Sequence, residues 1–144
     1  MSQKKKRLLA VLAAAMVLLL ARTLYVYTPA EAVIVFDDYA GTSFEEPLTD
    51  GEVRDFRRAV WGKLPLPEWL TGTPACGFGK GLSIVMGNKR YMLAWDSCGT
   101  LCVKDAVSDS EDRRYLNISG RQRAVIKEMF DTRIQRVRSE GKVS

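Results

Sequence analysis

The sequence predicts an α+β domain with a small antiparallel sheet, in the order strand, helix, β-meander, helix, preceded by a membrane-directing N-terminal helix. Three observations carry this prediction. Two amphipathic segments each follow a helix-capping motif, at Thr49 and at Ser119. Between them, residues 82–95 show two strand-like stretches around a Gly-Asn pair, the pattern of a β-hairpin. Ahead of all of these, residues 8–21 form an uncharged apolar run.

Four consecutive cations precede this apolar run. Such cations stay on the cytoplasmic side of a membrane while the adjacent apolar segment inserts. The fourteen uncharged residues suit the hydrophobic part of a signal peptide, but apolar character resumes after Arg22, so residues 8–27 reach the twenty residues of a spanning helix. We expect the membrane to be contacted through residues 8–27, with the topology set by Lys4, Lys5, Lys6 and Arg7.

Cleavage and anchoring both remain open for this segment. Residues 30–32 (Ala-Glu-Ala) fit the small-x-small rule, and cleavage near Ala32 would release a secreted protein. This site lies eleven residues beyond the uncharged run, further than a peptidase site usually lies. An uncleaved signal-anchor needs no such spacing, and we favour it. A buried helix of a cytosolic domain is the third interpretation, which the preceding cations disfavour.

A strand and an amphipathic helix follow. Residues 32–36 are short, apolar and β-branched, which predicts a buried strand, and residues 37–47 are predicted to be turn and loop. Thr49 and Glu52 form a capping box, in which each side chain bonds the backbone N–H of the other. The apolar side chains that follow recur on one helical face as far as the helix-ending Pro65, and they are Val53, Phe56, Val60 and Leu64.

A β-meander is predicted after this helix. The prolines of residues 64–70 predict an extended linker, and the glycines of residues 71–81 predict a loop. The strands of the meander are expected at residues 82–86, 89–95, 101–103 and 115–118.

The last helix is predicted to start after Ser119, which forms a second capping box with Gln122. Because Arg133 and Arg136 fall in the same sector as the apolar side chains before them, we expect the packed helix to end near Ile134. The expected regions are a membrane segment at residues 1–32, an extracytoplasmic α+β domain at 33–134 and a basic tail at 135–144.

Charge and composition argue against several functional classes. Residues 33–144 carry 17 basic and 16 acidic side chains, whereas a nucleic-acid-binding domain is normally basic. The sequence has no histidine, the commonest general base and zinc ligand. Acidic clusters at residues 37–46 and 109–112 match no cation-binding loop. We therefore expect no nucleic-acid partner, no catalytic residue, no cofactor and no metal site.

Three cysteines, Cys76, Cys98 and Cys102, lie in the region expected to be exported. In an oxidising compartment we expect a structural disulfide between Cys76 and either Cys98 or Cys102. Ordinary buried thiols are the alternative. Cys98 and Cys102 are spaced C-x₃-C rather than C-x-x-C, which gives a redox role weaker support.

The functional prediction is a non-enzymatic extracytoplasmic module that binds a protein or the cell envelope. We expect a single-pass membrane protein with its C-terminal domain outside the cytoplasm, or a secreted domain if the segment is cleaved. The alternative is an envelope protein active in thiol–disulfide exchange through Cys98 or Cys102. A third class, helix association within the bilayer, has little support because the apolar run contains no GxxxG.

Overall fold

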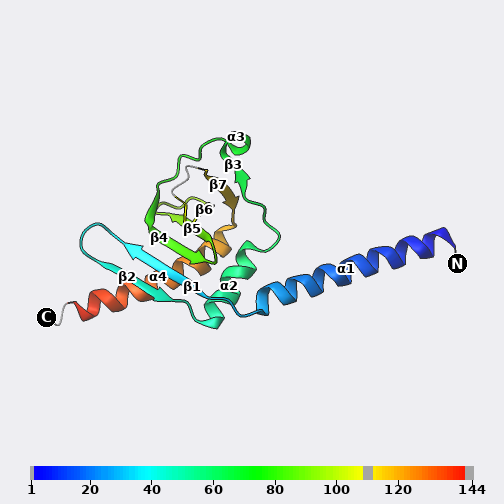
Figure 1. The fold of residues 1–144 in the computed structure, drawn as a ribbon, viewed down its shortest axis with the longest axis horizontal. Coiled ribbons are helices and arrows are strands. Elements are labelled where there is room, and N and C mark those ends of the chain that lie inside the picture. The colour runs from blue at the N-terminus through cyan, green and yellow to red at the C-terminus, as the bar shows by residue number, and fades with distance from the viewer. Residues whose placement is uncertain (1, 109–111, 142–144) are drawn as a thin grey trace.

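The structure, a computed structural model, describes residues 2–108 and 112–141, which form one seven-stranded sheet and four helices (Figure 1). Asp109 and Glu111, from one of the acidic clusters, lie outside these residues. The elements are, in chain order, α1 (Gln3–Tyr27), β1 (Ala32–Asp37), β2 (Ser43–Pro47), α2 (Asp50–Val60), β3 (Leu66–Pro67), α3 (Glu68–Thr71), β4 (Phe78–Met86), β5 (Lys89–Ala94), β6 (Thr100–Asp105), β7 (Arg114–Asn117) and α4 (Gly120–Glu140).

The sheet is antiparallel throughout, with the strand order β2-β1-β4-β5-β6-β7-β3. Strands β4 to β7 form the predicted meander. The predicted hairpin is confirmed, with Met86 paired to Lys89 across a turn in which Gly87 has a φ of 61°. The fold is thus α+β, although β2 and β3 add strands that the simple predicted order lacks.

Alternation along the strands divides the apolar side chains between two faces of the sheet. On one face, Leu93 and Leu101 are paired and join the main core, to which α2 contributes Phe56 and α4 contributes Phe130. A smaller cluster on the other face contains Met92, Cys102 and Tyr115. Both amphipathic helices therefore pack on the same face of the sheet.

Both predicted capping boxes are confirmed. The Glu52 carboxylate accepts from the Thr49 N–H at 2.8 Å, and the Thr49 hydroxyl accepts from the Glu52 N–H at 3.3 Å. The corresponding bonds of Ser119 and Gln122 measure 2.8 and 3.2 Å. Both helix starts were predictable because the groups that form them lie within three residues of each other.

The prediction that residues 42–47 are loop is wrong, because Ser43–Pro47 forms β2 beside β1. The tight turn between the two strands uses two positive φ angles, 59° at Tyr39 and 103° at Gly41. The Asp38 carboxylate accepts N–H groups of Ala40 and Thr42 in this turn. Phe44 of β2 stacks on Phe36 of β1, with ring centroids 5.2 Å apart.

The segment after α2 also differs from its prediction. Leu64, expected on the buried helix face, is 75% exposed because the helix ends four residues earlier, at Val60. Only Leu66–Pro67 is extended as a strand, and Glu68–Thr71 forms the short helix α3. β4 begins at Phe78, inside the expected loop, and a Cβ at Gly81 would lie 2.1 Å from the Asp37 carbonyl oxygen. Only glycine fits at that close approach of β4 to β1.

Helix α4 continues to Glu140, so residues 135–140 are helical rather than a tail, whereas the contact of α4 with the core does end near Ile134 as predicted. The two arginines that suggested an end, Arg133 and Arg136, both pair with Glu46, and Arg138 further along the helix pairs with Asp38. The helix therefore crosses the boundary expected between residues 134 and 135.

The N-terminal segment is one continuous helix, α1, which extends through Arg22 to Tyr27. It leaves the domain on one side, while the end of α4 projects on the other (Figure 1). It is long and apolar enough to cross a membrane, and most of its apolar side chains are exposed. A signal sequence has the same length and composition.

Candidate functional site at the junction of α1 and α2

The last turn of α1 packs against α2. Val26 is only 3% exposed, in contrast to the apolar side chains earlier in the helix. The Tyr25 ring lies against Trp61, the residue that follows α2, with centroids 5.3 Å apart. This contact fixes the end of the apolar helix on the domain rather than leaving it on a free linker.

Arg57 of α2 binds the end of α1 directly. Its Nη1 donates to the carbonyl oxygen of Tyr25 at 2.7 Å and to that of Thr28. Its guanidinium also lies 4.9 Å from the centroid of the Tyr25 ring. The last carbonyls of a helix have no partner within the helix and carry its negative dipole end, so a cation is well placed to satisfy them.

Two further arginines of α2 surround Tyr27. Arg58 Nη2 donates to the Tyr27 hydroxyl at 2.8 Å, and the guanidinium of Arg54 lies 5.9 Å from the ring centroid. Asp55 pairs with Arg58 at 3.0 Å and neutralises part of this charge. A small cavity of about 220 Å³ opens between the two helices and is lined by Leu19, Arg22, Thr23, Val26, Tyr27 and Arg58.

A wider open cavity, about 780 Å³, adjoins the junction on the sheet side. It is lined by residues that include Tyr25, Glu31, Arg57, Lys89 and Tyr91. Burial raises the pKa of the Tyr91 phenol, which keeps it protonated. The residues described here offer hydrogen-bond donors, cations and aromatic faces, but no nucleophile paired with a base. These groups can bind a polar or anionic ligand.

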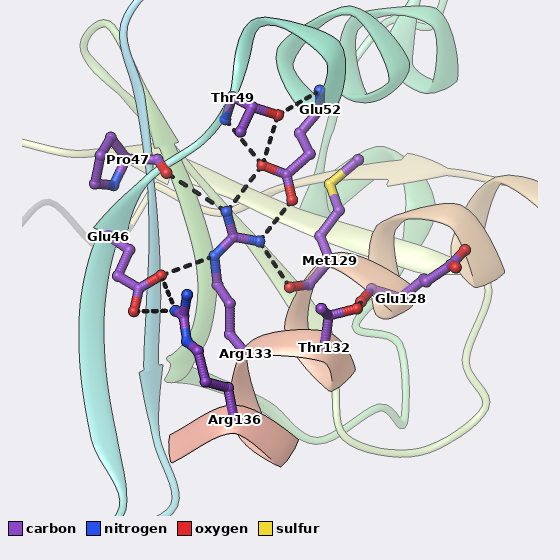
Figure 2. A network of polar contacts seen from close by, with 9 residues as sticks. All are labelled: Glu46, Pro47, Thr49, Glu52, Glu128, Met129, Thr132, Arg133 and Arg136. Atoms are coloured by element: carbon purple, nitrogen blue, oxygen red, sulfur yellow. Dashed lines mark hydrogen bonds and ion pairs between the residues drawn. The ribbon is translucent and has the colours of Figure 1, made fainter. Parts of the chain in front are cut away.

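A second polar cluster joins α4 to α2 and β2 (Figure 2). Arg133 is only 8% exposed, and its guanidinium donates to Glu52 at 2.6 and 2.8 Å and to Glu46 at 3.2 Å. It also bonds the carbonyl oxygens of Met129, at 2.9 Å, and Pro47. Hydrogen bonds from Arg133 hold the pKa of Glu52 at about 2. Because every donor has an acceptor, this cluster stabilises the domain and leaves nothing aimed at a ligand.

The structure pairs Cys76 with Cys98, with Cα atoms 6.0 Å apart, one of the two pairings left open by the sequence. Cys102 is a buried free thiol beside Met92 and Tyr115. Burial raises the pKa of the Cys102 thiol, which disfavours the reactive thiolate. Asp96 lies near Cys76 and Cys98, but sulfurs joined in a disulfide are not metal ligands. This geometry gives thiol exchange through Cys98 and Cys102 no support.

Lys4, Lys5, Lys6 and Arg7 lie in the first turns of α1, exposed and at the end of the helix remote from the domain. The sequence singled out these four cations but neither Arg57 nor Arg58. The signal was present in the shared face of Arg54, Arg57 and Arg58, at i, i+3 and i+4, with the aromatic pair of Tyr25 and Tyr27 upstream.

No family model, no curated protein and no solved structure matches this chain.

Proposed function

We propose that this chain is a single-pass membrane protein whose C-terminal domain lies outside the cytoplasm and binds a protein or envelope component without catalysing a reaction. The observation that carries the proposal is the form of α1. It is an exposed apolar helix with cations at its far end, and its near end is bonded to the domain through Arg57. A spanning helix with cytoplasmic cations places the domain on the opposite side of the membrane.

The junction supports an uncleaved anchor over a released domain. Cleavage near Ala32 would remove Tyr25 and Val26, which pack on α2, and the carbonyl acceptors of Arg57. Ala32 itself is buried, and its carbonyl oxygen accepts the Leu48 N–H at 2.8 Å. Residues beyond the apolar run are thus part of the folded domain, which is expected of an anchor and unnecessary in a discarded peptide.

The remaining features support export and binding. A disulfide between Cys76 and Cys98 is typical of an oxidising compartment outside the cytoplasm. The absence of histidine and the binding-type chemistry of the junction support a non-enzymatic role.

Translation of the full chain in the presence of endoplasmic-reticulum microsomes tests this topology. Asn117-Ile-Ser119 is a glycosylation sequon, and Asn117 is exposed, so export of the domain adds one glycan to the chain. We expect a full-length glycosylated product that resists alkaline extraction. Asn117→Gln is the matched control and removes the glycan.

Three outcomes are informative. An unglycosylated membrane-bound product would place the domain on the cytoplasmic side and contradict the proposal. A shortened, glycosylated product released by alkali would show secretion instead of anchoring. A glycosylated product in the membrane pellet supports the tethered form.

A further inference from the structure

The segment that follows α2 exposes an unusual amount of apolar surface. Trp69 is 84% exposed, Leu64 75% and Leu70 57%. We call these three residues the apolar rim. Single exposed apolar residues are ordinary, but Trp69 and Leu70 are adjacent on one short helix and Leu64 lies five residues earlier in the chain, which makes this segment a candidate contact surface.

The rim is held rigidly. α3 is anchored to the sheet through β3, where Leu66 pairs with Tyr115 and Pro67 pairs with Arg114 of β7. The turn closes through the Gly72 N–H, which donates to the Glu68 carbonyl at 2.8 Å, with Gly72 at a φ of 71°. Trp69 is therefore presented outward by a fixed turn rather than by a frayed loop.

The rim lies on the membrane side of the domain. Figure 1 shows the loop from α2 to β3 on the side from which α1 leaves, with β3 and α3 following it to the top of the view. The cavities agree with this placement. Leu64 shares one cavity with Lys89, and Lys89 shares the next with Tyr25 of α1. The Leu64 part of the rim and the end of the anchor thus belong to one continuous face.

We propose that this face lies on the lipid leaflet from which α1 emerges, with the apolar rim inserted at the interface. The inference rests on the proposed membrane tether. Trp and Leu side chains suit the boundary between headgroups and acyl chains. Lys63, next to Leu64 in the chain, supplies a cation that complements lipid phosphates.

Because α1 tethers the domain to the membrane, the small contact of the apolar rim is sufficient to hold this face on the leaflet. A patch of three side chains does not hold a soluble protein on a membrane, but α1 keeps the rim beside the leaflet at a high effective concentration. The contact would then fix the tilt of the domain and direct its opposite side, where Figure 1 shows the turn between β1 and β2, away from the bilayer.

Tryptophan fluorescence of the full chain in bilayers tests the proposal. The protein is reconstituted in phosphatidylcholine vesicles with or without bromine on the acyl chains, because bromine quenches tryptophan only at contact distance. We expect bromolipid to reduce the emission of the native chain. Trp69→Phe should remove part of that quenching. Trp95→Phe is the matched control and should remove none, because Trp95 directly follows β5 at the end opposite Lys89.

A reporter in the anchor separates the two proposals. Leu18→Trp places a fluorophore in the middle of α1, where bromolipid must quench it if the helix spans the bilayer. If Leu18→Trp is quenched while Trp69 contributes no quenching, the tether holds and the rim proposal is overturned, leaving the rim for a protein partner. If Leu18→Trp is not quenched, the tether itself fails, and the rim proposal fails with it.

Folding is not expected to confound this test. Trp69 is almost fully exposed, so Trp69→Phe removes little packing. A second measurement uses the unmodified chain, in which the aqueous quencher acrylamide should reach less of the tryptophan emission in vesicles than in detergent micelles, which have no leaflet. Equal accessibility in both would overturn the proposal.

Discussion

The burial of Arg133 was not predicted from the sequence. Its position in the apolar sector of α4 was interpreted as the end of packing, since an isolated arginine is costly to bury. In the structure its partners, Glu46 and Glu52, are 87 and 81 residues away in the chain. No local pattern predicts such a pairing. An arginine in the apolar sector of a helix nevertheless indicates a buried ion pair when the chain also contains carboxylates that have no predicted partner.

Replacing this guanidinium should unfold the domain more readily. Arg133→Met keeps the apolar stem but leaves the carboxylates of Glu46 and Glu52 without their cation, and we expect a loss of about 3 kcal/mol in the free energy of unfolding. Thermal or urea unfolding of the detergent-solubilised chain measures it. Arg136→Met is the matched control; because Arg136 is half exposed, it should cost less than about 1 kcal/mol. Equal losses in the two variants would contradict this account of the network.

The same ion pair predicts how stability depends on pH. The pKa of Glu52 is lowered from 4.5 to about 2, chiefly by its hydrogen bonds with Arg133. A lowered folded-state pKa stabilises the fold above the unfolded pKa, so the stabilisation is present above about pH 4.5 and is lost as the pH falls towards 2. The shift corresponds to about 3 kcal/mol. Unfolding measured between pH 6 and about 2 should show this loss.

Glu52→Gln provides the comparison for the pH series. This variant should be less stable at neutral pH and should show a flatter pH profile, because its amide does not titrate. Asp38, whose pKa is lowered by the N–H groups of Ala40 and Thr42, acts in the same direction and remains in both proteins. Parallel profiles for the native chain and Glu52→Gln would show that another group controls the acid response.

At the scale of elements, the predictions succeeded where the signal is local. Both capping boxes join residues three apart, and the β4–β5 hairpin depends on a two-residue turn. β2 was missed because residues 42–47 hold two glutamates and a proline, which are poor strand formers. Its strand conformation comes from pairing with β1 and from Phe44 stacking on Phe36, which are tertiary interactions.

The contact of α1 with α2 should depend on Arg57. Arg57→Ala removes charged hydrogen bonds to the carbonyls of Tyr25 and Thr28, interactions of about 1.5–3 kcal/mol. We expect the junction to open at least roughly tenfold more often. Each opening exposes the peptide bond after Glu31 to a glutamate-specific protease. Mass spectrometry of the fragment that begins at Ala32 follows the rate.

Arg54→Ala is the control for this experiment. Arg54 lies over the Tyr27 ring at 5.9 Å and bonds no carbonyl of α1, so its loss should change the cleavage rate little. If Arg57→Ala and Arg54→Ala cleave at the native rate, the end of α1 is not held by Arg57.

The disulfide should behave as a staple between the loop before β4 and the turn before β6. Unfolding without reductant and trapping of free thiols should label one cysteine, Cys102. Cys76→Ser should lower the free energy of unfolding by about 3 kcal/mol, because the bond closes a loop with a sequence separation of 22. Cys98→Ser should lose as much, and the double variant no more than either. Three labelled thiols in the native protein would contradict the pairing.

For the whole molecule, the sequence predicted the parts better than their assembly. The apolar segment and the α+β class followed from run length, flanking charge and periodicity, all of which are properties of neighbouring residues. The junction was not predictable in this way, since Arg57 and Arg58 bond residues 29 to 32 positions earlier across the turn into β1. The same limit left the cysteine pairing open, as spacing alone does not select between Cys98 and Cys102.

The assembly leads to a prediction about the mature chain. Val26 and Ala32 are both 3% exposed, so the native fold includes residues on each side of the link that connects α1 to β1. Cleavage near Ala32 would also place a new charged amino terminus at Val33, a residue paired with both Pro47 and Val85. We therefore expect the protein purified from its own host to retain the residues ahead of Ala32, including α1, which mass spectrometry of its peptides would detect. A mass corresponding to residues 33–144 would contradict the anchor, and recovery of the longer chain in Ala30→Leu, which blocks a small-x-small site, would identify signal-peptide cleavage as the cause.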